Sequence, residues 1–189
     1  MKPLVLAALL STSATLAMAA EKYVLDASHS QVVFSYNHLG FSTTYGMFSG
    51  FEGEIMFDEA DPAKSSVSVS MPTKSMFTGW EKRDAHFMSD DFFGATDEDM
   101  ITFTSTSIEV TGDGTANITG DLTMNDITKS VVLATNLNQL SEHPMAKKPW
   151  AGFNATTTLM RSDFGVEKFA PFVSDEIGVT ISLEAMKAG

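Results

Sequence analysis

The segment RDAHFMSDDFF, residues 83–93, places charged side chains among aromatic rings. Its Arg83, Asp84 and His86 are residue types that transfer protons or orient a reacting group in enzymes. No second catalytic group can be identified beside His86, so an enzyme hypothesis would depend on these three residues alone. The segment therefore raises catalysis as one alternative, against which the rest of the sequence has to be weighed.

Other catalytic and metal-binding patterns are missing from the sequence. Its four histidines show neither the H-x-x-x-H nor the H-x-H spacing that brings two imidazoles to one metal ion, and it contains no cysteine. It also lacks the G-x-S-x-G, P-loop and G-x-G-x-x-G motifs, which mark serine nucleophiles and nucleotide sites. We therefore predict no catalytic residue, no metal site and no cofactor.

The same segment has the composition of a lid over an apolar space. Trp80, Asp84 and Phe87 follow helical spacing, which predicts one short helix between two strands. We expect this helix to cap one end of a barrel, where Phe87, Phe92 and Phe93 plug the lumen. A lid of this kind presents apolar rings inward and polar groups at its edges.

Charged side chains are expected to fasten the lid to the rim of the barrel. We predict that Arg83 pairs with Asp163 and that Asp84 pairs with Arg161, through charge-assisted hydrogen bonds to the later segment RSDFG. Two alternatives stay open, namely an ordinary surface helix with solvated charges and catalysis by His86.

Alternation with a period of two residues dominates the rest of the chain. Val32, Phe34, Tyr36 and His38 share one face of a predicted strand, and this face is mostly apolar. The alternation recurs at residues 55–57, 67–71, 101–105, 118–124, 131–133, 153–159 and 177–183. With turn signals between these segments, the pattern predicts an all-β fold, an antiparallel barrel of about eight strands.

The inward faces of these strands predict a ligand-binding lumen. Aromatic and aliphatic residues alternate there with the small or polar Ser105, Gly120, Ala155 and Thr157, which leave volume unfilled. Ordinary core packing explains most of the aromatic residues on its own. The residues expected to line the lumen are Val32, Phe34, Tyr36, His38, Phe48, Ile55, Val69, Phe103, Leu122, Leu133, Phe153, Ala155 and Ile181.

The first 19 residues predict a cleaved secretory signal peptide. Lys2 precedes an apolar run at residues 4–10, and small residues end in an A-x-A pattern at Ala19. The run is too short for a retained membrane helix, which needs about 20 apolar residues. We therefore expect residues 20–189 to form a single domain with no integral membrane segment, exported to a bacterial periplasm, an oxidising compartment that suits a chain without cysteine.

The formal net charge of −12 limits the range of partners. A polyanion repels nucleic acid and anionic lipid headgroups at long range, so we expect no nucleic-acid partner. The same charge favours an uncharged headgroup over a pyrophosphate in a lipid ligand.

Five ordered segments resemble the YceI-like family of exported polyisoprenoid-binding proteins. They are LDASHSQVVFSYNHLGFSTTYGMFSGFEGEIMFD, RDAHFMSDDFF, ITFTSTSIEV, GDLTMNDITKSVVL and GFNATTTLMRSDFGV, and they extend from about Tyr23 to Ala185. The resemblance implies a lipocalin-like barrel that holds a polyisoprenoid, a quinone or a fatty-acid-like lipid, without catalysis. It also implies a homodimer as the default state.

The function predicted from the sequence is therefore binding, transport or storage of a long-chain amphiphilic lipid in the periplasm. Two alternatives stay open: an enzyme that acts on such a lipid, and a ligand-free stress-response or interaction protein.

Overall fold

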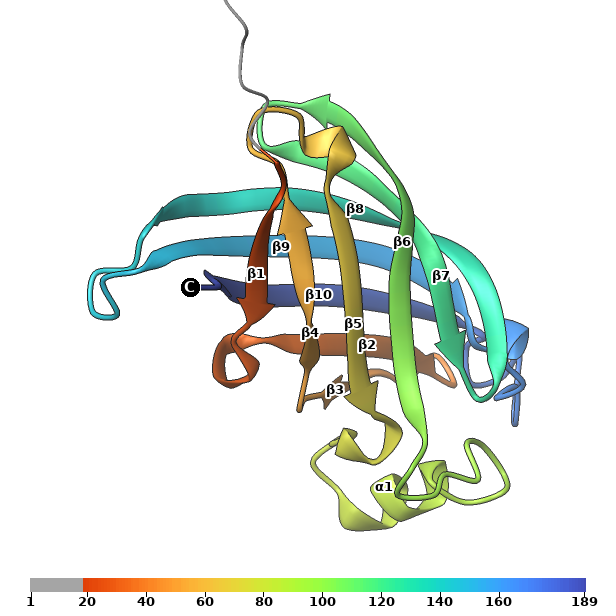
Figure 1. Cartoon of the computed structure of the whole chain (residues 1–189). Helices are drawn as coiled ribbons and strands as arrows, with labels where there is room; N and C mark the ends of the chain where they lie inside the picture. The colour runs from red at the N-terminus through yellow and green to blue at the C-terminus, as the bar shows by residue number, and fades with distance from the viewer. Residues whose placement is uncertain (1–18) are drawn as a thin grey trace, which may run out of the picture.

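The structure is a computed structural model that describes residues 19–189, so the predicted signal peptide lies outside the described residues except for Ala19. Ten strands in this range form one antiparallel sheet that curves around on itself (Figure 1). The strands are β1 (Glu21–Leu25), β2 (Gln31–His38), β3 (Ser42–Phe48), β4 (Glu52–Phe57), β5 (Ser66–Pro72), β6 (Met100–Gly112), β7 (Thr115–Met124), β8 (Ile127–Glu142), β9 (Pro149–Met160) and β10 (Glu176–Lys187).

Pairing between β1 and β10 closes the sheet into a barrel. Tyr23 lies opposite Lys187 and Leu25 opposite Ala185, which joins the first strand to the last. The closed ring runs in the order β1-β4-β5-β6-β7-β8-β9-β10. The predicted antiparallel barrel of about eight strands is confirmed.

The membership of the ring differs from the prediction in one respect. The predicted strand at residues 32–38 is β2, which pairs with the first half of β10 and carries β3 as a hairpin outside the ring. The eighth ring strand is instead β1, which the alternation pattern missed. With five residues, β1 shows only two inward positions, Tyr23 and Leu25, and this is too short a pattern to identify a strand.

One α-helix, α1 (Glu81–Phe87), lies in the described residues, below the lower end of the barrel in Figure 1. Four 3₁₀ turns complete the regular structure. They are η1 (Ala27–His29), η2 (Pro62–Lys64), η3 (Thr73–Ser75) and η4 (Arg161–Phe164). The predicted short helix between two strands is confirmed, and no helix among residues 19–189 has the length and apolar character that a bilayer crossing requires.

Two inward-facing glycines accept phenylalanine rings from neighbouring strands. A Cβ atom at Gly46 would clash with the ring of Phe34, and one at Gly120 would clash with the ring of Phe103. The expectation that Gly120 leaves volume unfilled is therefore wrong, because Phe103 occupies that space. Both rings are buried and line the interior of the barrel.

Candidate ligand-binding cavity

The barrel encloses a cavity of about 860 Å³, lined by residues from all ten described strands and from the α1 segment. Binding pockets for small ligands typically measure about 300–1,000 Å³, so this cavity is at the large end of the range. Most of its lining is aliphatic or aromatic, because the inward face of each strand carries the apolar residues of the alternation. Such a space favours a long apolar guest over water.

All thirteen residues predicted to line the lumen do line this cavity. Val32, Phe34 and Tyr36 project from β2, and Ala155 projects from β9 opposite Ile181 of β10. His38, at the end of β2, also lines the cavity although it is exposed. Their contact with a bound ligand stays a prediction.

Charged lining residues are confined to cations near α1. Lys82 and Arg83 belong to α1 and Arg161 follows β9, while His38 and His86 add imidazoles. Among the described lining residues there is no aspartate or glutamate, although the chain has 24 acidic and 12 basic residues. The charged side chains that line the cavity therefore have the opposite sign from the net charge of the protein.

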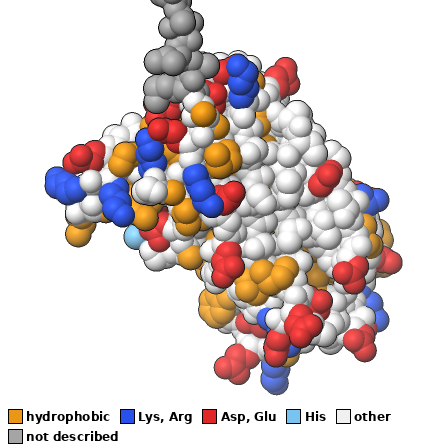
Figure 2. Space-filling view, in the orientation of Figure 1, with side chains coloured by type: hydrophobic (Ala, Val, Ile, Leu, Met, Phe, Trp, Pro, Cys, Tyr) orange, Lys and Arg blue, Asp and Glu red, His pale blue; other side chains and the backbone are white. Residues whose placement is uncertain are grey.

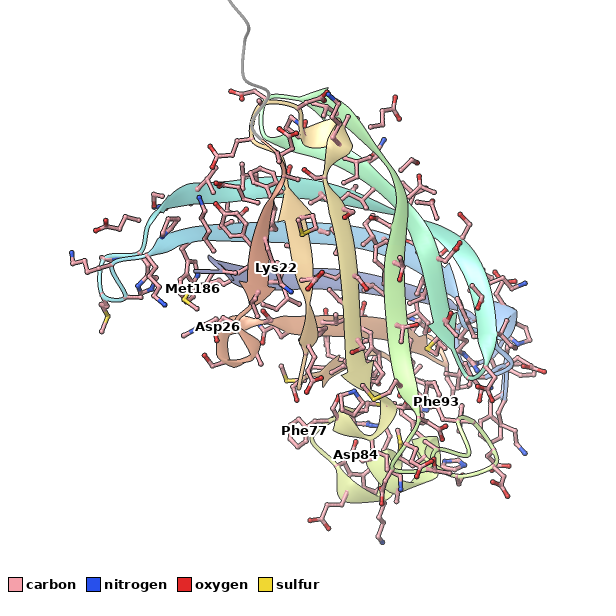
Figure 3. The ribbon with its side chains drawn as sticks, viewed as in Figure 1. Lys22, Asp26, Phe77, Asp84, Phe93 and Met186 are labelled. Carbon is pink, nitrogen blue, oxygen red and sulfur yellow. The ribbon has the colours of Figure 1, made fainter. Side chains whose placement is uncertain are left out.

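Aromatic rings of the α1 segment pack over the end of the cavity. The ring of Phe87 lies 6.2 Å from that of Tyr36 on β2 and 5.0 Å from that of Phe92, measured between centroids. Phe92 in turn lies 6.2 Å from Phe169, in the segment after η4. Phe93 packs against the core from the side of α1 that faces the barrel (Figure 3). Trp80, Phe87, Phe92 and Phe93 all line the cavity, as a lid requires.

The predicted anchors of the lid are wrong in their partners. Asp84 accepts hydrogen bonds from the backbone N–H of Thr78, at 2.9 Å, and from the Thr78 hydroxyl. Arg83 donates from Nε to Thr78 Oγ1 at 2.8 Å and from Nη2 to the Thr78 carbonyl at 2.6 Å. These partners are five and six residues away, and closing so short a loop costs little entropy. The two charges therefore brace the entry into α1 rather than the barrel rim.

Arg161 has a different role from the predicted one. Its buried guanidinium donates to the backbone carbonyls of Ser174, at 2.9 Å, Val173, at 2.9 Å, and Val166. Burial lowers the pKa of this guanidinium from its ordinary value. Arg161 thus fastens residues 166–174 to the end of β9, while Asp163 is exposed and does not line the cavity.

The lid is instead joined to the barrel through Asp91, which the sequence did not single out as an anchor. Its Oδ1 accepts from Lys168 Nζ at 2.9 Å and its Oδ2 lies 2.9 Å from His86 Nε2. These hydrogen bonds, from Lys168 first and His86 second, hold the pKa of the Asp91 carboxyl below its usual range. No sequence signal relates Asp91 to Lys168, because they are 77 residues apart in different loops.

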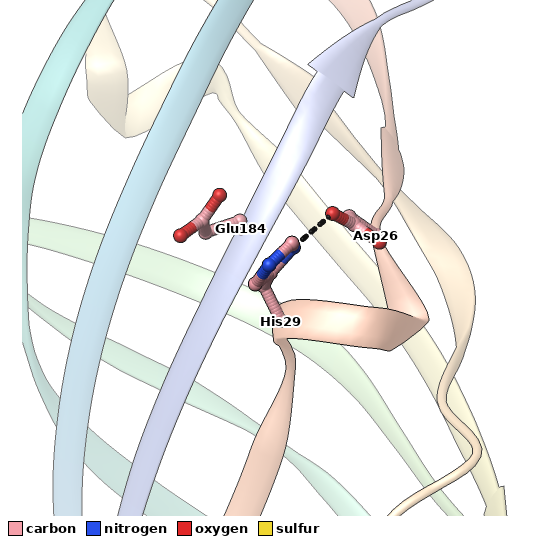
Figure 4. A group of neighbouring side chains, drawn as sticks. All are labelled: Asp26, His29 and Glu184. Atoms are coloured by element: carbon pink, nitrogen blue, oxygen red, sulfur yellow. Dashed lines mark hydrogen bonds and ion pairs between the residues drawn. The ribbon is translucent and has the colours of Figure 1, made fainter. Parts of the chain in front are cut away.

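A second polar cluster, Asp26, His29 and Glu184, lies outside the cavity lining (Figure 4). Asp26 caps η1 by accepting from the backbone N–H of Ser28 at 3.0 Å, and it lies 2.6 Å from His29 Nδ1. Glu184 accepts from Trp150 Nε1 at 2.7 Å. The hydrogen bond to Asp26 raises the pKa of His29 and lowers that of Asp26. These bonds occupy the three side chains, and the backbone N–H of Asp26 donates to the Glu184 carbonyl at 2.9 Å, which joins the start of η1 to β10.

Comparison with known proteins identifies the family. A family model described as the YceI-like domain matches residues 23–185. The chain belongs to the YceI-like family. A relative in Ectopseudomonas mendocina, described as a UPF0312 protein, is 42% identical over 96% of this chain and 97% of its own length. Another UPF0312 protein, from Azotobacter vinelandii, is 40% identical over 90% of this chain and 89% of its own length.

Solved structures share the YceI-like fold. The YceI protein of Campylobacter jejuni has 29% sequence identity and a TM-score of 0.72, over 81% of this chain and 90% of that one. BcnA of Burkholderia cenocepacia has 24% identity and a TM-score of 0.76, over 85% and 98%. A polyisoprenoid-binding domain from Saccharophagus degradans has 16% identity and a TM-score of 0.67, over 88% and 98%. The last two comparisons concern the fold alone, and the predicted family is confirmed.

Proposed function

We propose that this YceI-like protein binds a long-chain amphiphile of the isoprenoid type, with its tail inside the barrel and its headgroup near α1. The observation that carries the proposal is the cavity of about 860 Å³ with an almost wholly apolar lining, closed by aromatic rings at one end. The protein would act as a carrier or store for such a lipid.

The energetics of burial support a long apolar tail. Removing a CH₂-sized group from water contributes about 0.8 kcal/mol, whereas association costs about 4–15 kcal/mol. A few isoprene units therefore offset the cost of binding, and a short apolar molecule does not. The description of the Saccharophagus degradans domain as polyisoprenoid-binding agrees with this class of ligand.

The charges around the cavity support a headgroup that accepts hydrogen bonds. Lys82, Arg83 and Arg161 all carry donors, and the lining residues among positions 19–189 include no carboxylate. A quinone or phenol oxygen, a carboxylate and a phosphate are all acceptors of this kind. The expectation of an uncharged headgroup relied on the net charge of the chain. The residues that line the cavity give no reason to prefer an uncharged headgroup over an anionic one.

Binding without turnover is part of the proposal. His86 lines the cavity, but its Nε2 is directed to Asp91, which also pairs with Lys168. The three side chains thus form a structural link between two loops. An enzyme acting on the same lipid is the alternative, and a measurable turnover of a lipid extract would favour it.

Export to a periplasm and assembly as a homodimer remain proposals. The support for export is the sequence of the first 19 residues, and the support for a homodimer is the resemblance to the family.

Native mass spectrometry of the purified protein, followed by organic extraction, tests the proposed function. We expect a long-chain amphiphile to copurify at one molecule per chain, and a fluorescent apolar probe to bind after the lipid has been removed. Absence of any lipid from several expression hosts, together with no binding of the probe, would refute the proposal.

A further inference from the structure

Two loops meet at one end of the barrel, close to the α1 lid. The turn between β2 and β3 and the segment 169–174 lie side by side at the right of Figure 1. The backbone N–H of Ser174 donates to the Asn37 carbonyl at 3.0 Å, and His38 and Val173 form an antiparallel bridge. By this register, Phe172 is next to Leu39.

Large apolar side chains project from both loops into solvent. Phe41 is 88% exposed and Phe172 is 77% exposed, while Leu39 and Phe169 are about half exposed. We call these four residues the rim surface. Phe169 lines the cavity itself. Leu39, Phe41 and Phe172 are each next in the sequence to a lining residue, namely His38, Ser42 and Val173. The rim surface therefore lies beside residues that line the cavity.

Charged side chains are absent from the two stretches that carry the rim surface, although Glu167, Lys168 and Asp175 flank the second stretch. Residues 27–51 and 169–174 contain no aspartate, glutamate, lysine or arginine, in a chain with 24 acidic and 12 basic residues. Elsewhere, charged side chains are scattered over the face drawn in Figure 2, including the end where α1 lies. Within these two stretches a partner meets apolar and uncharged polar side chains, and the nearest cation in the sequence, Lys168, is paired with Asp91.

The backbone does not explain why these residues are apolar. Leu39, with φ of 56°, and Gly40, with φ of 78°, are the central residues of a tight hairpin turn, and Phe169 also has a positive φ of 66°. Glycine and asparagine are favoured at such positions, because a side chain with a Cβ branch or bulk is strained there. Leu39 thus occupies a turn position that favours glycine or asparagine, whereas Phe169 at its own positive φ also packs against Phe92 and His86.

From these observations we propose that the rim surface docks on a lipid bilayer with zwitterionic headgroups. Single side chains that project from two turns suit insertion among lipid headgroups, whereas stable contacts between two protein copies need a broad complementary surface. The net charge of −12 disfavours an anionic bilayer. The inference rests on the proposed function in one respect: docking here lets the lipid tail pass between bilayer and cavity without crossing water.

Flotation with phosphatidylcholine vesicles tests the docking surface. We expect the full chain to bind these vesicles, and to bind vesicles that also contain phosphatidylglycerol more weakly. Phe41→Ser and Phe172→Ser should each weaken partitioning about tenfold. Leu39→Asn should weaken it without loss of thermal stability, because asparagine suits the turn. Met145→Ser, at an 87% exposed residue in the β8–β9 loop, is the control and should leave partitioning unchanged.

Binding of a fluorescent apolar probe added from ethanol, without vesicles, separates this inference from the proposed function. The rim variants should bind the probe as the parent does. If the parent binds the probe but not the vesicles, or if the variants float as well as the parent does, the docking surface is refuted while the proposed function stands. If the variants instead convert a dimer into a monomer in sedimentation and the parent does not float, the rim surface is a contact between copies and the inference is wrong.

Discussion

Lys168 Nζ lies 2.9 Å from Asp91 Oδ1, so one ion pair joins the loop after η4 to the loop after α1. The other carboxylate oxygen of Asp91 holds His86, whose ring packs 5.1 Å from that of Phe92 and 6.2 Å from that of Phe169. The ion pair and the aromatic contacts together connect the lid to the loop after η4. Opening the lid requires both to separate.

Removing the ion pair should therefore release the ligand faster. For Lys168→Met we expect the dissociation rate of a bound apolar probe to increase up to about fivefold, because exposed pairs contribute about 0–1 kcal/mol. Stopped-flow displacement of the probe measures the rate. Lys64→Met, which removes a comparable exposed pair with Asp61 at 3.1 Å, is the control. Equal rates for the two variants would show that the pair does not hold the lid.

The pH dependence of release should follow Asp91. Its pKa is lower in the folded protein than the ordinary aspartate value of about 3.9, so its contribution is complete above that value and is lost as pH falls through the lowered pKa. Probe dissociation should thus be constant from pH 7 to about pH 4 and accelerate below it, with a smaller acceleration in Asp91→Asn. An acceleration between pH 7 and pH 5 would mean that a histidine, rather than Asp91, controls the lid.

Filling the cavity from β9 should block binding. Ala155 is buried between Thr135 of β8 and Ile181 of β10, and a tryptophan in its place extends into the space that the tail would occupy. We expect Ala155→Trp to weaken probe binding more than tenfold and to cost about 1–3 kcal/mol of stability through overpacking. Fluorescence titration and urea unfolding measure the two effects.

The matched control for this variant is Ala134→Trp, because Ala134 is exposed on the neighbouring strand β8. This variant should bind the probe as the parent does. If Ala155→Trp also binds it normally, the ligand does not occupy this part of the cavity.

Arg161 should contribute more to stability than any surface charge. Replacing it with methionine keeps much of its volume but leaves the carbonyls of Val166, Val173 and Ser174 without their buried donor. We expect Arg161→Met to lower the free energy of unfolding by about 2–4 kcal/mol, measured by urea denaturation. A change below about 0.5 kcal/mol would show that water replaces the guanidinium at no cost.

The architecture could be predicted because its signals are local. Alternation of apolar and polar residues identified every strand from β4 to β10, and the helical spacing of Trp80, Asp84 and Phe87 identified α1. β3 was missed because Gly46 stands at an inward position, where the ring of Phe34 takes the place of a side chain. A glycine that accommodates a ring from another strand gives no apolar signal of its own.

The cavity lining could be predicted for the same reason, whereas the lid contacts could not. Which residues face inward follows from strand periodicity, but the partner of a charge depends on how loops fold. Arg83 and Asp84 form hydrogen bonds with the nearby Thr78, and Arg161 donates to backbone carbonyls. Every residue has a backbone carbonyl, so the sequence does not indicate which of them Arg161 contacts. The net charge was also a poor guide, since it sums residues that lie far from the cavity.

The pairing of Tyr23 with Lys187 has a consequence for the order of assembly. The two ring neighbours are near opposite ends of the chain, so the wall around the cavity has a gap until the last strand has been synthesised and has reached the first. A truncated chain that ends before β10 has no enclosed interior, whatever strands it has already formed. The cavity therefore forms only in a late step, when β10 pairs with β1. A lipid that is present during this step can be enclosed as the two strands pair.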